Sequence, residues 1–171
     1  MHNYLMTWLT TVTVLSKIAF QYYPLDQNPQ SNPFIVSWWP LALNDPGLFN
    51  VSLQTASLDD ERLAQKGFPH SEILMSDCVQ LIRHKVQDPV LAFGDSTLAA
   101  VVTLAAIEVT YNSFLSKIGT NFKKHGKENY EVSSMHINGV RRMVNVRGGI
   151  QEVKKTSPIT ARMVPWQENL L

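Results

Sequence analysis

The feature that most constrains this fold is a set of apolar stripes at helical spacing. Apolar residues at i, i+3 and i+4 line one face of an α-helix, whereas a half-buried strand alternates every second residue. Helical stripes run through about 46–63, 71–86, 95–109 and 134–146, and convincing strand alternation is absent. The chain is therefore predicted to be all-α, with several helices packed around one core.

Capping residues predict where these helices begin. Asp45 can cap the first helix, and Pro46 suits its first position because the missing N–H would have no partner there. Ser71 is expected to cap the second helix, and Asp95 or Ser96 to open the most apolar one, at the centre of the core. Asp88-Pro89 repeats the start signal for a short element in between. The second stripe comprises Ile73, Leu74, Cys78, Leu81, Ile82 and Val86.

Glycine and proline predict where helices end. Gly67-Phe68-Pro69 is expected to stop the first helix, and Gly148-Gly149 the helix over 134–146, since glycine adopts the left-handed conformation easily. A short helical turn to Lys155 and a last segment from Ser157-Pro158 follow. Residues 112–131 interrupt the periodicity and are predicted to be a loop or a frayed insert.

The first 32 residues are expected to form an apolar segment and a proline-rich lead-in, with the helical domain over 33–171. The apolar run 5–15 is about half of the ~20 residues that a membrane-spanning helix needs. It lacks the basic start and small-residue cleavage site of a signal peptide, so it is expected to dock on the core. Five prolines within 22–46 predict an extended surface segment, including residues 34–39.

Charge is balanced overall but uneven along the chain. Fifteen Lys and Arg against 14 Asp and Glu give +1, which supplies no general attraction to nucleic acid or an anionic membrane. Residues 1–110 carry −5 and residues 111–171 carry +6. One interpretation is a basic patch for an acidic partner or, through Lys123, Lys124 and Lys127, nucleic acid. The favoured interpretation is that the two parts complement each other within one fold.

No residue pattern predicts a metal or cofactor. Cys78 is the only cysteine, and the five histidines form no cluster with it, whereas zinc needs three or four converging ligands. Phosphate-binding glycine motifs are missing. Cys78 is expected to be a small buried thiol. We therefore assign no catalytic, cofactor-binding or metal residue from sequence, and predict no cofactor.

One motif leaves an enzymatic alternative. Gly94-Asp95-Ser96-Thr97-Leu98 follows the apolar run 89–93 and nearly matches the Gly-Asp-Ser-Leu motif of a lipase-like hydrolase family. Ser96 would then be the nucleophile at the end of a buried strand. That chemistry needs an oriented imidazole, and no Asp in the sequence has a His three residues later. A small serine hydrolase using Ser96 remains the second hypothesis.

Three groups of short motifs, in a consistent order and spacing, carry a family resemblance. The first group lies at 39–49 and 53–57, and the second at 88–89, 95–101 and 104–108. The third is His-Ile-Asn-Gly-Val at 136–140, then 143–144 and Arg-Gly-Gly-Ile at 147–150. Together with Trp166, they make residues 33–168 resemble the regulatory domain of fungus-specific transcription factors of the zinc-cluster class. The family has Asp two positions after that tryptophan, where this chain has Glu168.

The resemblance implies an all-helical, non-enzymatic regulator of transcription in the nucleus, or otherwise in the cytoplasm. A chain with one cysteine cannot build the family's six-cysteine zinc cluster, so no direct DNA binding is expected. The 112–131 insert lengthens one gap, and the family's domain generally continues beyond the position of Leu171. A truncated helical array is therefore expected to expose apolar helix faces to a protein partner or a second copy, and no membrane is involved.

The polar motif residues are expected to hold helices together. Arg147 can reach the last carbonyls of its helix or a nearby carboxylate such as Glu108, and Asp95 can act as a cap. His84 and His136 are expected to be surface or capping residues.

Overall fold

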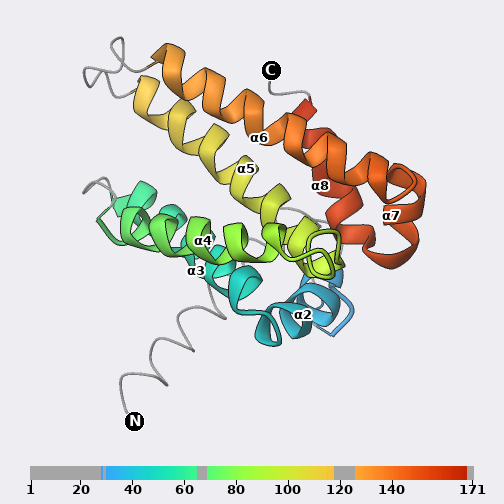
Figure 1. The fold of residues 1–171 in the computed structure, drawn as a ribbon. Helices are drawn as coiled ribbons and strands as arrows, with labels where there is room; N and C mark the ends of the chain where they lie inside the picture. The colour runs from blue at the N-terminus through green and yellow to red at the C-terminus, as the bar shows by residue number, and fades with distance from the viewer. Residues whose placement is uncertain (1–27, 29, 65–68, 118–125, 169–171) are drawn as a thin grey trace. The chain divides into compact units, whose positions relative to one another are not determined.

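The computed structural model describes residues 28, 30–64, 69–117 and 126–168. Every regular element in these ranges is a helix, which confirms the predicted all-α class (Figure 1). In chain order the elements are the π-helix η1 (Phe34–Trp38) and the α-helices α2 (Trp39–Leu43), α3 (Pro46–Ala64), α4 (Pro69–Gln87), α5 (Asp95–Lys117), α6 (Gly126–Val146), α7 (Ile150–Thr156) and α8 (Pro158–Glu168).

The chain divides into two compact units, Met1–Leu81 and Ile82–Leu171. The division falls inside α4, so each unit is described by itself. The apolar run at 5–15 lies outside the described residues. The sequence-based bounds of 1–32 and 33–171 stay a prediction.

Residues 34–43 are helical, and the predicted extended segment is wrong for this part of the chain. Pro33 precedes η1 and Pro40 lies in the first turn of α2, where a missing N–H is tolerated. The buried Asn32 accepts a bond from the Phe34 N–H through Oδ1, at 3.0 Å, and so begins the helix. Proline density alone therefore did not exclude a helix, because Pro33 and Pro46 fall at helix starts and Pro40 lies in the first turn of α2.

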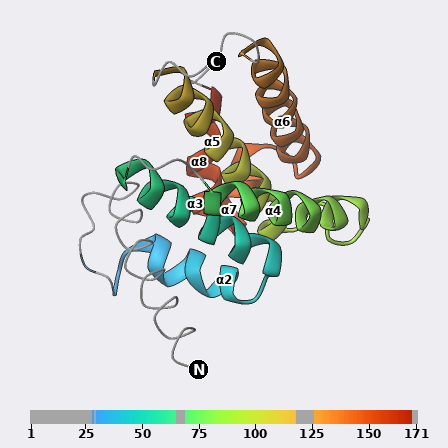
Figure 2. The ribbon, with the colours of Figure 1, turned by 90° about the vertical axis from the view of Figure 1, so that its left-hand side faces the viewer.

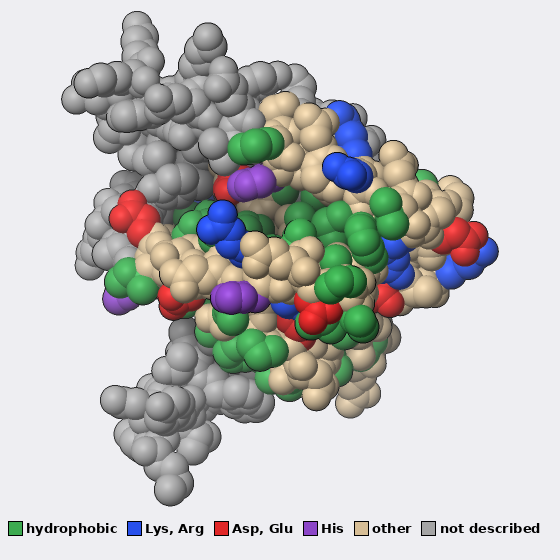
Figure 3. Space-filling view, in the orientation of Figure 1, with side chains coloured by type: hydrophobic (Ala, Val, Ile, Leu, Met, Phe, Trp, Pro, Cys, Tyr) green, Lys and Arg blue, Asp and Glu red, His purple; other side chains and the backbone are tan. Residues whose placement is uncertain are grey.

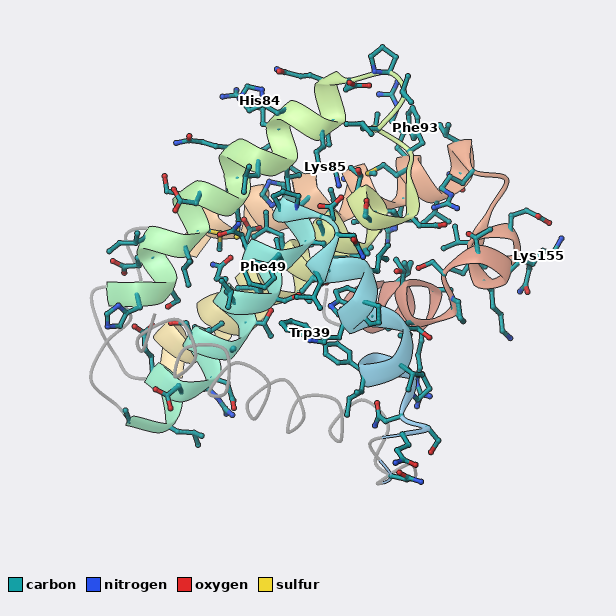
Figure 4. The ribbon with its side chains drawn as sticks, turned by 90° about the horizontal axis from the view of Figure 1, so that it is seen from below. Trp39, Phe49, His84, Lys85, Phe93 and Lys155 are labelled. Carbon is teal, nitrogen blue, oxygen red and sulfur yellow. The ribbon has the colours of Figure 1, made fainter. Side chains whose placement is uncertain are left out.

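Aromatic packing holds this short helical pair in the first unit. The rings of Phe34 and Trp38 stack with centroids 5.4 Å apart, and both side chains are buried. The Trp38 Nε1–H donates to Ser52 Oγ on α3 at 3.2 Å. Trp39 and Phe49 form a second, tilted pair with centroids 6.0 Å apart, visible in Figure 4. These contacts attach η1 and α2 to α3.

The start of α3 is as predicted, whereas α4 begins differently. Asp45 lies one residue before Pro46, which begins α3, and its Oδ1 accepts the Leu48 N–H at 2.9 Å. Helix α3 ends at Ala64, before the predicted stop, and α4 begins at Pro69, two residues before Ser71, while residues 65–68 lie outside the described residues. The buried carboxylate of Glu61 on α3 caps α4: Oε1 accepts the His70 N–H at 2.7 Å, and Oε2 accepts from Ser71.

In the second unit, α5 packs against both α6 and α8 (Figures 1 and 2), and most of its side chains over 97–107 are buried. Its buried side chains are Leu98, Ala99, Ala100, Val102, Leu104, Ala105 and Ile107. Helix α6 contributes Ile137, Val140, Met143 and Val144 and exposes Arg141 and Arg142, as its periodicity predicted. The expected central position of α5 is therefore confirmed within this unit.

The predicted loop at 112–131 is too long. Helix α5 continues to Lys117 and α6 already begins at Gly126, while residues 118–125 lie outside the described residues. A run of polar residues weakens the apolar periodicity without ending a helix, because lysine and glutamate are good helix formers. The sequence prediction relied on periodicity and therefore ended α5 too early and began α6 too late.

Two glycines end α6 as predicted. The Gly149 N–H bonds to Val144 O at 2.9 Å, and the Gly148 N–H to Asn145 O at 3.0 Å, which is the Schellman arrangement. Both glycines have positive φ, +89° and +94°. The chain then turns into α7 and, at Ser157, into α8, so the two short C-terminal elements are also as predicted.

Replacing Gly149 with alanine is expected to lower the free energy of unfolding by about 1–3 kcal/mol, because L side chains rarely adopt its φ of +94° and ψ of 175°. Gly139 is the matched control within α6, where an added Cβ meets no atom within 4 Å. Gly139→Ala should stabilise the chain by about 0.4–1 kcal/mol. Urea unfolding monitored by circular dichroism measures both, and equal effects of the two variants would contradict this account.

Candidate functional site

The start of α5 is held by a polar cluster, which we call the Asp95 cluster: Asp95 of α5, Arg147 in the turn after α6 and Thr156 of α7. Arg147 Nη1 lies 2.5 Å from Asp95 Oδ1, and Nη2 donates to Thr156 Oγ1 at 2.7 Å. The Thr156 hydroxyl donates onward to Asp95 Oδ1 at 2.9 Å. The Arg147 side chain is only 15% exposed, so solvent screens this ion pair weakly. The cluster ties the end of α6 and the end of α7 to the start of α5.

Glu108, the carboxylate suggested for Arg147, pairs instead with His136. His136 Nδ1 on α6 contacts Glu108 Oε2 on α5, and the two side chains are 38% and 14% exposed. His136 is therefore an interhelical residue, not the surface or capping residue expected. Arg147 meets Asp95 because the antiparallel course of α5 and α6 brings the C-terminal end of α6 to the N-terminal end of α5.

The Glu108 contact raises the pKa of His136. The hydrogen bond from the imidazole to the carboxylate is the largest cause, and the charge of Glu108 adds to it, while partial burial acts in the opposite direction. The histidine therefore holds its proton more tightly in the folded protein than in the unfolded chain.

Ser96 lies beside a lysine. Lys85 Nζ, from the end of α4, donates to Ser96 Oγ at 3.0 Å, and both residues belong to the second unit. Residues 88–94 form successive turns rather than the buried strand that a hydrolase motif would follow. Figure 4 shows Lys85 and His84 projecting from different sides of α4, and His84 is exposed. Ser96 Oγ thus contacts a lysine side chain rather than an imidazole.

Cys78 is fully buried, as the sequence predicted. Burial is the main cause that raises the pKa of its thiol to about 12, and the neighbouring Asp77 adds to the effect. The thiol is therefore neutral and a poor nucleophile at physiological pH. Within the described residues, no three His, Cys, Asp or Glu side chains come together in a way that could hold a metal ion.

The sequence analysis expected exposed apolar faces but did not locate one surface, which we call the 86–93 turn: Val86 near the end of α4, and Val90, Leu91 and Phe93 in the turns that follow. Val90 is 86% exposed, and the others are 43–47% exposed. The helical stripe had placed Val86 and Ile73 on the buried face, yet Ile73 is also exposed, at 66%. Apolar residues within a turn follow no period, so only their position after the start signal Asp88-Pro89 could have indicated this surface.

The predictions for Trp166 and for the three lysines of the basic insert concern side chains that the structure does not describe. The side chains of Trp166 and Lys127 are not described, and Lys123 and Lys124 lie in the undescribed residues 118–125. Across the described ranges, no helix is both long and apolar enough to cross a lipid bilayer.

Comparison of the chain with known protein families, curated proteins and solved structures finds no match. The resemblance to zinc-cluster transcription factors therefore stays a prediction, and the site is interpreted from its own geometry.

Arg147→Met is expected to lower the free energy of unfolding by about 1–3 kcal/mol, because it leaves Asp95 and Thr156 without their charged partner. Arg142→Met, which alters an exposed arginine near the end of α6, should change it by less than about 0.5 kcal/mol. Thermal or urea unfolding compares the two variants. A similar cost for both would mean that the Asp95 cluster contributes nothing specific.

Stability should also depend on pH through His136. Its folded pKa lies above the unfolded value of about 6.5, so the stabilisation is fully present below that pH and is lost as the pH rises through the folded pKa. His136→Gln should therefore destabilise the chain most near pH 5.5 and least near about pH 9. Urea unfolding across this range tests the prediction, with the exposed His84→Gln as a control whose effect should stay small throughout. A pH-independent difference between wild type and His136→Gln would contradict it.

Proposed function

We propose that this chain is a non-enzymatic helical regulatory and interaction domain of the kind found in fungal zinc-cluster transcription factors. It acts in transcription regulation, in the nucleus, without a DNA-binding module of its own. Its partner is another protein, or a second copy of the chain, bound through exposed apolar side chains.

One observation carries the proposal. The polar residues of the two later motif groups, far apart in the sequence, pair with one another in the second unit. Asp95 from one group contacts Arg147 from the other, and Glu108 contacts His136 in the same way. Gly148 and Gly149, also motif residues, form the turn that follows Arg147. A motif whose members join helices to each other is typical of a structural framework, and this supports an interaction domain.

A serine hydrolase using Ser96 remains the second candidate, for one specific reason. Lys85 Nζ is 3.0 Å from Ser96 Oγ, and serine–lysine pairs serve as nucleophile and base in some hydrolases. The lysine would have to be neutral to accept the serine proton.

The proposed function predicts that the full chain, fused to an unrelated DNA-binding domain, changes transcription from a reporter gene carrying that domain's sites. The expected change is severalfold relative to the DNA-binding domain alone. Arg147→Met should reduce the effect because it loosens the motif-built framework, whereas Arg142→Met should retain it. Reporter activity at equal protein level is the measurement.

Two outcomes would count against this function. One is an unchanged reporter when the fused chain is folded and present in the nucleus. The other is hydrolysis of a short-chain ester by the purified chain that Ser96→Ala abolishes, which would favour the second candidate.

A further inference from the structure

Thr156 is the exposed member of the Asp95 cluster. It is the last residue of α7 and is exposed, whereas Asp95 and Arg147 are partly buried. Its hydroxyl accepts a bond from Arg147 Nη2 at 2.7 Å and donates one to Asp95 Oδ1 at 2.9 Å. Of the three side chains, only that of Thr156 is an alcohol, the group that protein kinases phosphorylate. The oxygen that joins the end of α7 to the start of α5 is therefore also one that can be modified.

Helix α7 is short and weakly anchored. It has seven residues, of which only Val153 is buried. A helix of this length is not stable by itself, so its end can open locally at a small cost in free energy. Lys154 and Lys155 are exposed directly before Thr156. Figure 3 shows charged side chains of both signs at the surface over α7, and Figure 4 shows Lys155 projecting outward. The segment is therefore accessible to a kinase that selects basic residues beside its target.

We propose that Thr156 is a phosphorylation site and that its phosphate draws Arg147 away from Asp95. The Thr156 Oγ attacks the γ-phosphorus of a nucleoside triphosphate held by a protein kinase, and an oxygen–phosphorus bond forms. The bond from this phosphorus to the β–γ bridging oxygen breaks, the nucleoside diphosphate leaves, and the hydroxyl proton passes to a base of the kinase. This inference goes beyond the proposed function and does not depend on which partner the domain binds.

The phosphate changes both bonds that the hydroxyl makes. The esterified Oγ has no proton to donate to Asp95, and a group of charge about −2 stands beside that carboxylate. Arg147 Nη2 already lies 2.7 Å from the oxygen that carries the phosphate, and a guanidinium binds phosphate through two parallel bonds. The phosphate also lies at the C-terminal end of α7, where the helix dipole disfavours negative charge. Phosphorylation is therefore expected to release the start of α5 from the cluster.

The test of this release uses the full chain with phosphothreonine incorporated at position 156 during translation. Thermal unfolding monitored by circular dichroism should show a melting temperature about 2–8 °C below that of the unmodified chain. In Asp95→Asn, which has no carboxylate to repel the phosphate, the same modification should lower the melting temperature less than half as much. Thr156→Val removes both bonds without adding charge, and should lower it less than the phosphate does. The circular dichroism spectra verify that each variant is folded.

A kinase reaction tests whether Thr156 is accessible. The unmodified full chain is incubated with ATP and the catalytic fragment of protein kinase C, and mass spectrometry locates the phosphate. Thr156 should be modified, and the double variant Lys154→Ala, Lys155→Ala should be modified at least about fivefold more slowly.

Four outcomes overturn the inference. They are an unmodified Thr156 in the kinase reaction, phosphate on Ser157 in its place, a phosphorylated chain at least as stable as the unmodified one, and an equal loss of stability in Asp95→Asn. None of these outcomes involves the reporter assay, so this inference and the proposed function can fail separately.

Discussion

The second unit depends on the burial of α5 over residues 97–107, where most side chains are buried whichever face they lie on. A helix with apolar side chains on every face cannot satisfy them with one neighbour, so both α6 and α8 pack against it. Such packing is non-directional and leaves the rotation and register of each helix weakly defined. Two polar links fix the rotation and register of α5 relative to its neighbours. The Asp95 cluster fixes α5 at its first residue, and the Glu108–His136 pair fixes it farther along the helix.

These links stabilise the unit differently from the apolar core. Replacing an apolar contact lowers stability roughly in proportion to the area lost, whereas removing one member of a shielded ion pair leaves its partner without compensation. Arg147 is the clearest case, because its guanidinium serves two helices at once and has little access to solvent. Gly148 and Gly149, which follow Arg147, add to this arrangement because their positive φ angles turn the chain from α6 into α7.

Most of the helices could be predicted from the sequence, because burial of one face imposes a period and caps mark the ends. Asp45, Gly148 and Ser157 stand where their chemistry indicated. The helix at 34–43 and the helix ends within 112–131 were mispredicted for local reasons, whereas two other failures depended on a partner distant in the sequence. Helix α4 is capped by Glu61 of another helix, so Ser71 misled the prediction, and His136 has no local feature that points to Glu108. The exposure of the 86–93 turn could not be predicted for the same reason, because it depends on which side chains the surrounding helices cover.

Polar and apolar residues are placed differently around the start of α5. Charged motif residues are drawn inward to join helices, while the turn that leads into Asp95 carries apolar side chains outward. Both features share one backbone, because the Gly94 N–H bonds to Leu91 O and the Leu98 N–H to Gly94 O, so the turn runs without a flexible break into α5. The turn and the Asp95 cluster are therefore parts of one continuous hydrogen-bonded segment, whose end at Asp95 is held by Arg147.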